Sequence, residues 1–184
     1  MAAFSELDQM IRNGRGNSPT FAEALVRHYY DYIYRLAVSI LGVPTDADDI
    51  CQETFIGALL NIDRYSPGTN LKAWLSKIAV HKCQAVLRRR SVSHAWEQTL
   101  RNMQKLFHNS PAEMLAQSEK RRELWSMVDS LNEKHRIPVI LYFVYDLKIR
   151  EIAAILDIPE GTVSSRLYNA VHRLGAHLKA DDED

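Results

Sequence analysis

The chain has 184 residues, 46% of them hydrophobic and 25% charged, which is an ordinary composition for a globular protein of one medium domain or two small ones. No apolar run is long enough to cross a membrane, and the first residues lack the pattern of a secretory signal, so a cytoplasmic protein without membrane insertion is expected. The 23 basic and 23 acidic residues cancel, and this zero net charge at first argues against a nucleic-acid partner.

Apolar residues recur every three to four positions and glycine is scarce, so the sequence predicts an all-α fold. A first long helix is expected to run to Leu41, with Ser18 as its N-cap and Pro19 at its first position. A second helix is expected from Thr45 to about Ile62. Acidic residues fill its first turn, where they complement the helix dipole.

The charge is distributed unevenly along the chain. Residues 1–60 hold 8 acidic and 4 basic residues, a net charge of −4. Residues 61–90 hold 1 acidic and 7 basic residues, a net charge of +6, and the last five residues contribute −4. The basic segment is a candidate phosphate-binding face, although a solvated helix surface would explain Arg88-Arg89-Arg90 equally well.

A third helix is expected from Asn70 to about Arg90. Residues 91–112 lose the helical pattern and read as a linker, and Asn109-Ser110-Pro111 is a turn signal within it. Helical periodicity resumes afterwards. The sequence therefore predicts two small helical domains, residues 1–90 and residues 113–184, the second ending in an acidic tail.

The clearest motif lies between residues 148 and 174. A short helix from Lys148 to Leu156 and a tight turn over residues 157–161 precede a second helix from Thr162 to His177. The second helix is expected to bury Val163, Leu167, Ala170, Val171 and Leu174. Its outer face then carries Thr162, Ser164, Ser165, Arg166, Tyr168, Asn169 and Arg173.

This arrangement is typical of a DNA-binding helix-turn-helix. The major groove of DNA admits one helix, and arginine can donate two hydrogen bonds to guanine. Backbone amides at the start of such a helix can also hold a phosphate. A plain helical hairpin on the surface of a bundle is the alternative interpretation.

No signal for catalysis or cofactor binding stands beside this motif. Cys51 and Cys83 are expected to stay reduced, and neither has partners at the spacing of a zinc site. Nucleotide-binding and metal-hydrolase motifs do not occur. The sequence therefore predicts no catalytic residue, no metal and no cofactor, and a protein that is not an enzyme.

Three blocks in order, residues 46–59, 63–90 and 131–174, together resemble bacterial RNA polymerase sigma factors of the extracytoplasmic-function group. The chain departs from the family pattern at Asp157, where a turn glycine is common, and at His81-Lys82, which replaces an asparagine neighbourhood. Aspartate tolerates a left-handed backbone better than most residues, so the first departure is compatible with the turn.

The resemblance implies a factor that binds core RNA polymerase, recognises the −10 and −35 promoter elements and promotes promoter melting. Docking on the polymerase would fall to Asp46, Asp48, Asp49, Gln52 and Glu53. The −10 element would contact Asn61, Arg64, Tyr65, Asn70, Lys72, Trp74, Lys77, Arg88, Arg89 and Arg90. The outer face of the helix after the turn, with Ser165 and Arg166 first, would read the −35 element.

Each of these assignments has a competing explanation. The acidic residues could serve only the helix dipole and solubility, and Trp74 lies on an apolar stripe that favours a core position. For the whole protein, the rivals are a dimeric helix-turn-helix regulator that works without polymerase and an adaptor whose helices dock other proteins. The resemblance adds an anti-sigma factor as a further candidate partner.

Overall fold

The computed structural model describes the backbone of residues 2–14, 16–104 and 119–180 and the side chains of residues 6–14, 16–90 and 125–174. Every regular element in these ranges is a helix, which confirms the all-α prediction. Within them, no helix is both long and apolar enough to cross a membrane. Part of the predicted linker, residues 105–112, and the acidic tail, residues 181–184, lie outside the described residues.

The first domain begins with α1 (Ala2–Arg12) and α2 (Pro19–Leu41). The predicted start of α2 is confirmed, because the Ser18 hydroxyl accepts a hydrogen bond from the Phe21 amide at 3.2 Å and Pro19 opens the helix. Gly42 ends α2 with a φ of 73°, a left-handed conformation that glycine adopts without strain. The side of α2 that faces the domain is fully buried, with Phe21, Leu25, Ile33, Leu36 and Ile40.

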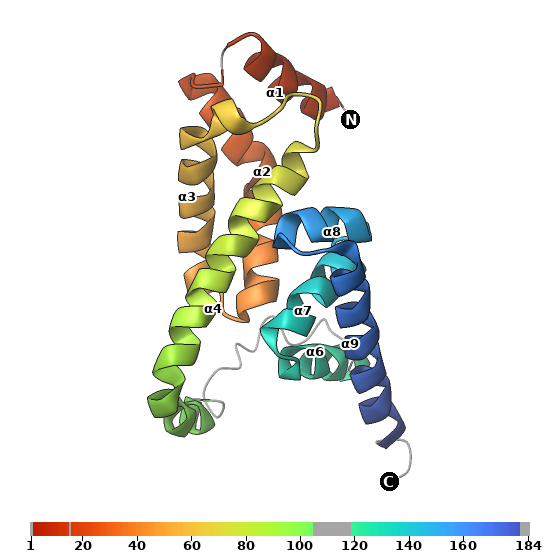
Figure 1. Ribbon diagram of the computed structural model, residues 1–184. Helices are drawn as coiled ribbons and strands as arrows, with labels where there is room; N and C mark the ends of the chain where they lie inside the picture. The colour runs from red at the N-terminus through yellow and green to blue at the C-terminus, as the bar shows by residue number, and fades with distance from the viewer. Residues whose placement is uncertain (1, 15, 105–118, 181–184) are drawn as a thin grey trace.

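Two further helices complete this domain, α3 (Thr45–Leu60) and α4 (Leu71–Gln104), with a single 3-10 turn, η1 (Ile62–Arg64), between them. The sequence predicts that α4 ends near Arg90, but the helix continues to Gln104. Residues 91–104 contain neither glycine nor proline, so nothing in the backbone stops the helix there. Figure 1 shows α2, α3 and α4 packed side by side.

The second domain contains α6 (Glu119–Ser130), α7 (Glu133–Val139), α8 (Ile149–Leu156) and α9 (Glu160–Ala180). A π-helical turn, η2 (Ile140–Val144), follows α7 directly, and the Tyr145 amide donates to the Ile140 carbonyl at 3.2 Å. Its core gathers Ile137, Ile140, Leu141, Ile152, Ile155, Val163 and Ala170.

The predicted helix-turn-helix forms, with α8 and α9 joined by a short turn, but the second helix begins at Glu160 and not at the predicted Thr162. Asp157 ends α8 with φ 53° and ψ 45°, so aspartate does adopt the left-handed conformation there. One expectation about α9 is wrong. Val171 is exposed, because the buried side of α9 follows Val163, Leu167 and Ala170 and turns away before Val171.

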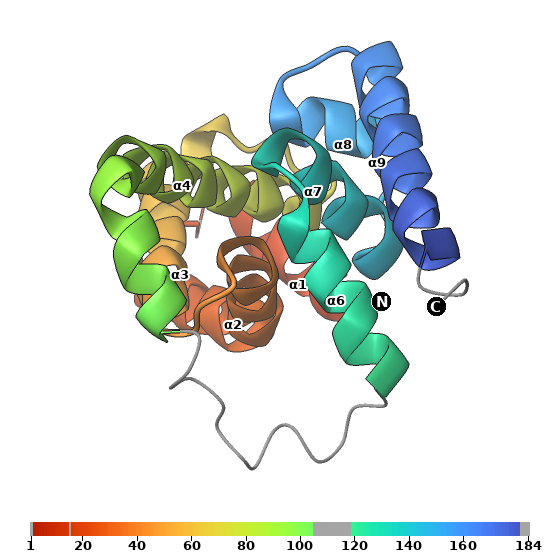
Figure 2. The same cartoon turned by 90° about the horizontal axis from the view of Figure 1, so that it is seen from below.

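The two domains contact each other where α8 meets α4, as Figures 1 and 2 show from two directions. Tyr32 of α2 and Tyr145, just after η2, meet edge to face with ring centres 5.3 Å apart. The helix-turn-helix therefore lies against the N-terminal half of the basic helix.

Candidate nucleic-acid interface

The residues at the start of α3 that were predicted to contact the polymerase differ in whether they have a partner within the chain. Asp49 and Gln52 are exposed. Asp48 accepts a hydrogen bond from the Tyr30 hydroxyl at 2.6 Å, which raises the pKa of Tyr30 to about 12. Glu53 lies 2.8 Å from the Lys82 ammonium of α4.

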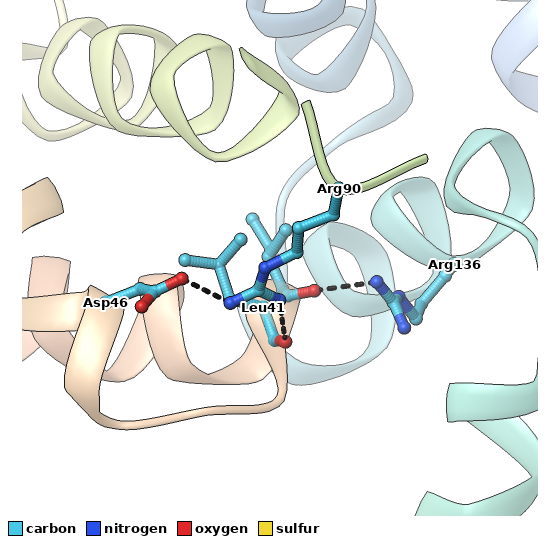
Figure 3. Close-up of polar contacts among 5 residues, drawn as sticks. Leu41, Asp46, Arg90 and Arg136 are labelled. Carbon is cyan, nitrogen blue, oxygen red and sulfur yellow. Dashed lines mark hydrogen bonds and ion pairs between the residues drawn. The ribbon is translucent and has the colours of Figure 1, made fainter. Parts of the chain in front are cut away.

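Asp46 has a different environment, since it faces Arg90 at the turn between α2 and α3. The Arg90 guanidinium donates to the Asp46 carboxylate and, at 3.1 Å, to the Leu41 carbonyl (Figure 3). Arg136 of the second domain approaches the same turn and donates to the Ile40 carbonyl at 2.9 Å. Asp46 and Arg90 thus join helices within the first domain, and their side chains are 37% and 24% exposed.

The far end of α3 carries a feature that the sequence-based prediction missed. Ile56 is 58% exposed and Leu60 is 79% exposed. They continue the line of Asp49 and Glu53, because positions 49, 53, 56 and 60 follow one another at helical spacings of four, three and four. We call these four residues the α3 stripe. Its apolar end was a readable signal, since both residues interrupt an otherwise polar helix face.

The loop after α3 is built around Tyr65, which is only 4% exposed. Its hydroxyl donates to Asp8 at 2.9 Å and to the Thr69 carbonyl at 2.7 Å, and burial raises its pKa to about 12. Asp8 also accepts from the Gly68 amide at 2.9 Å. Tyr65 therefore shapes the loop from inside and offers no open ring to a base.

Other predicted residues of this loop are more accessible. Arg64 is exposed, while Asn61 is half-buried and donates to the Gly57 carbonyl at 2.9 Å. A hollow of about 260 Å³ opens beside the loop. Its lining is Ile11, Gly14, Gly16, Asn17, Ile62, Asp63, Tyr65 and Pro67.

The predicted residues at the start of α4 and just before it differ in what they contact. Asn70 caps the helix by accepting from the Ala73 amide at 3.1 Å. The Lys72 ammonium lies 4.3 Å from the centre of the Tyr32 ring, a cation–π geometry. Trp74 is half-buried and meets Tyr65 with ring centres 5.4 Å apart, so its ring packs within the domain. Lys77 contacts Asp157 of the other domain at 2.5 Å.

Further along α4, Arg88 and Arg89 are exposed and extend the basic surface. They are the outward members of the Arg88-Arg89-Arg90 run, since Arg90 turns back to the α2–α3 turn. Long basic side chains at such positions can follow a phosphate backbone.

The outer face of α9 is open along most of its length. Ser164, Ser165, Asn169 and Arg173 are exposed, and Tyr168 is 71% exposed. The two serine hydroxyls bond only within the helix, to the Glu160 carbonyl at 3.1 Å and the Thr162 carbonyl at 3.0 Å. Thr162 and Arg166 are half-buried at the edge of this face.

His135 lies at the start of α7, a helix that packs against α9, and it was not among the residues predicted from the sequence. Burial lowers the pKa of His135, and Arg173, Arg166 and Lys134 lower it further. The positive charges of these three residues therefore disfavour protonation of the imidazole by electrostatic repulsion. An anion such as a phosphate would relieve that repulsion.

The second domain also exposes a group of apolar side chains. The π-turn presents Tyr142, Phe143 and Val144, and Phe143 is 61% exposed. Tyr142 and Phe143 contact edge to face with ring centres 4.9 Å apart. Neighbouring exposed apolar residues of this kind are a candidate contact surface for another protein.

The cysteines face inward. Burial raises the pKa of Cys51 to about 11 and that of Cys83 to about 12, so both thiols stay protonated at neutral pH. In the part of the chain that the structure describes, no three residues of metal-binding type converge on one point.

Comparison with protein families matches both domains. Residues 25–92 match Sigma-70 region 2, and residues 121–174 match Sigma-70, region 4. The ECF RNA polymerase sigma factor SigW of Bacillus subtilis is 28% identical over 173 residues, which cover 90% of this chain and 92% of SigW. EcfG of Rhodopseudomonas palustris is 32% identical over 150 residues, which cover 79% of this chain and 78% of EcfG.

The fold is also similar to two solved structures. CnrH, in complex with the cytosolic domain of CnrY, superposes with a TM-score of 0.68 and 23% identity over 97% of this chain and 99% of CnrH. RpoE of Bartonella quintana, in complex with the anti-sigma factor NepR, gives a TM-score of 0.64 and 23% identity over 86% of this chain and 97% of RpoE. At this identity the two structures bear on the fold alone.

Proposed function

Because this chain belongs to the extracytoplasmic-function group of bacterial sigma factors, and thus recognises promoters to initiate transcription with RNA polymerase, we propose how its surfaces divide that work. The α3 stripe docks on the polymerase, α4 with its preceding loop holds the −10 element, and α9 reads the −35 element. The polymerase performs the chemistry, and this chain recognises the promoter and promotes strand separation.

The −35 assignment rests on the outer face of α9. Its hydroxyls, Asn169 and two arginines offer donors to base edges and phosphates, and a helix of this kind fits the major groove. Ser165 and Arg166 lie within the first two turns of α9, and the N-terminal part of the helix is the part that contacts base edges in this motif. His135 and Lys134 extend the basic surface beside α9 and would hold the adjacent phosphates.

The −10 assignment rests on the basic surface of the first domain. Arg64, Lys77, Arg88 and Arg89 lie along α4 and its loop, where they can follow the backbone of a separated strand. A separated strand also needs a place for an unstacked base. The hollow beside residues 61–69 would offer one, since polar Asn17 and Asp63 and apolar Ile62 and Pro67 all line it.

One observation favours a polymerase-dependent factor over a regulator that works alone, and it is the α3 stripe. Exposure of Leu60 to water does not stabilise a protein that works alone. In a complex, an apolar side chain that the partner buries inside a rim of charged residues is typical of a protein interface. The exposed patch at Phe143 would give the second domain its own contact with the polymerase. An anti-sigma factor, such as the one seen with RpoE, would compete for surfaces of this kind.

The test is transcription from a promoter library with purified core polymerase. Adding the chain should produce new transcripts with shared upstream elements, and the chain should co-purify with the polymerase. A chain that binds duplex promoter DNA tightly by itself, and neither joins the polymerase nor changes its start sites, would contradict the proposal.

A further inference from the structure

One carboxylate of α1 binds the loop between η1 and α4 at two points. Oδ1 of Asp8 lies 2.9 Å from the Tyr65 hydroxyl, and Oδ2 accepts a hydrogen bond from the Gly68 amide at 2.9 Å. Asp8 belongs to the second half of α1, and Gly68 lies 60 residues further along the chain. Figure 1 shows this loop passing beside α1 on its way to α4.

The first of these points, Gly68, is the loop residue with the greatest backbone freedom. Its φ of 95° lies in the left-handed region, which glycine adopts without strain. Gly68 is exposed, so without Asp8 its amide would face water. A β-carbon at position 68 would lie 2.9 Å from Nη2 of Arg12, so a second α1 side chain also reaches the loop there. The turn at Gly68 is therefore held by α1.

The second point, Tyr65, links Asp8 to the rest of the loop and to α4. The Tyr65 hydroxyl lies 2.7 Å from the Thr69 carbonyl, and its ring meets Trp74 of α4 with ring centres 5.4 Å apart. A phenolic hydroxyl has one proton to donate, so the Asp8 carboxylate and the Thr69 carbonyl share it. Asp8 thus acts on both ends of the segment from Tyr65 to Thr69.

This segment forms part of the hollow assigned above to an unstacked base. Tyr65 and Pro67 line the hollow, and Ile11 of α1 lines it as well. A shift of the loop away from α1 would therefore change the shape of the hollow. The match to Sigma-70 region 2 begins at residue 25, so it does not include α1.

We propose that Asp8 is a positioning residue for −10 recognition, which holds residues 65–69 in the shape that receives the unstacked base. The inference rests on the proposed role of this loop in binding the −10 element. Asp8 is half-buried and acidic, which disfavours contact with a phosphate, so it acts through Tyr65 and Gly68. A loop that is already ordered loses less conformational entropy when the strand binds, which favours the matching sequence.

The first measurement detects the Asp8 bonds without DNA. Hydrogen exchange of the Gly68 amide is followed by NMR in the free full-length chain. Asp8→Ala should speed this exchange by about tenfold or more, because the amide loses a hydrogen bond to a charged acceptor. Glu6→Ala is the matched control, since Glu6 is an exposed acidic residue of the same helix, and it should leave the exchange unchanged.

A conservative variant separates the hydrogen bonds of Asp8 from its charge. In Asp8→Asn, the amide oxygen can accept from Gly68 while the amide nitrogen donates to the Tyr65 oxygen. The Tyr65 proton is then left for the Thr69 carbonyl, so every group keeps a partner. Asp8→Asn should therefore retain slow exchange of the Gly68 amide, although it removes the negative charge.

The second measurement tests positioning, with core polymerase and a promoter whose −10 bases are changed one at a time. Permanganate reactivity of unpaired thymines reports opening of each promoter. Asp8→Ala should reduce the preference for the best −10 sequence by about three- to tenfold, a part of what one base position contributes. Asp8→Asn should restore the preference, and both variants should keep −35 protection and polymerase affinity.

A core substitution controls for a general loss of stability. Leu36 is fully buried in α2, about two turns beyond Tyr29, the α2 residue whose pKa Asp8 and Tyr65 influence. Leu36→Val should lower the melting temperature and keep the −10 preference. Equal losses of preference in Leu36→Val and Asp8→Ala would mean that destabilisation is the cause, and would overturn positioning.

The remaining outcomes separate this inference from the function on which it rests. Unchanged exchange of the Gly68 amide in Asp8→Ala would overturn the role of Asp8, whatever the promoters show. Faster exchange with an unaltered −10 preference, or a loss in Asp8→Asn as large as in Asp8→Ala, would also overturn it. Equal opening of all −10 variants by the natural chain would instead contradict the −10 role of the loop, and positioning with it, while the exchange data would still decide whether Asp8 holds the loop.

Discussion

The two surfaces proposed to bind DNA differ in how accessible they are. The outer face of α9 is open, and its serines bond only to carbonyls of their own helix. At the start of α4, by contrast, Asn70 and Lys77 contact the carboxylates of Glu151 and Asp157. On the proposed roles, the face that would read duplex DNA is already accessible, whereas Asn70 and Lys77 must give up these contacts before they can bind a separated strand.

The largest expected effect concerns that other protein. Replacing both Ile56 and Leu60 with serine should weaken core polymerase binding by about 2 kcal/mol or more, because exposed apolar anchors carry most of an interface's binding energy. Affinity can be measured by fluorescence titration with labelled polymerase. Thermal unfolding followed by circular dichroism should be unchanged, since both side chains are exposed, and an unchanged polymerase affinity would refute docking through the α3 stripe.

Arg166→Ala and Arg89→Ala together sharpen the comparison between the two surfaces. Loss of a base contact by Arg166 should cost about 1–3 kcal/mol and relax the sequence preference at one −35 position. Loss of a phosphate contact by Arg89 should weaken binding evenly across sequences and lower its salt dependence. Competition among promoter variants at several salt concentrations distinguishes the two patterns. If Arg166→Ala lowered the affinity equally for all promoter variants, Arg166 would not contact a base.

A smaller effect is expected at the turn that positions α4. Arg90→Lys should lower the free energy of unfolding by about 0.5–1 kcal/mol, because lysine cannot reach both Asp46 and the Leu41 carbonyl with one fork of donors. Chemical denaturation measures this change. Arg89→Lys, the exposed neighbour, is the matched control and should leave stability unaltered; equal effects at both positions would mean that Arg90 has no special role.

The smallest effect is a pH dependence on the α9 side. The lowered pKa of His135 keeps it neutral at pH 7, and a nearby phosphate would raise that pKa, so DNA binding should take up a proton. Affinity for the −35 duplex should then rise by about twofold as the pH falls from about 7.5 to about 5.5. His135→Gln should abolish this pH dependence of the affinity, and His172→Gln should retain it. The reverse result would mean that the proton is taken up by a group other than His135.

The elements of the fold followed closely from the sequence. Caps, breakers and periodicity located α2, α3, α8 and α9, because Ser18, Gly42 and Asp157 act through local backbone chemistry. The end of α4 was misplaced, since the polar residues after Arg90 weaken the apolar stripe without breaking the backbone. The π-turn after α7 has no sequence signature, and it rotates the apolar run so that Tyr142 and Phe143 face outward.

The candidate site was less predictable, because it depends on contacts between distant segments. Residue type could mark Asp46, Tyr65 and Arg90 as polar or aromatic candidates, but their partners lie 44 or 57 residues away in the chain. Likewise, nothing local to Asp157 or Lys77 indicates that they meet across 80 positions. What periodicity could have shown is the α3 stripe, whose four members share one face.

Promoter opening tests the division of labour between α4 and α9 most directly. Permanganate reactivity of unpaired thymines near the −10 element can be followed together with protection of the −35 element, at saturating concentrations of polymerase and this chain. Lys77→Gln should retain −35 protection and lose reactive thymines, whereas Arg166→Ala should lose protection at limiting concentrations and still open DNA once bound. Normal thymine reactivity in Lys77→Gln would contradict the account.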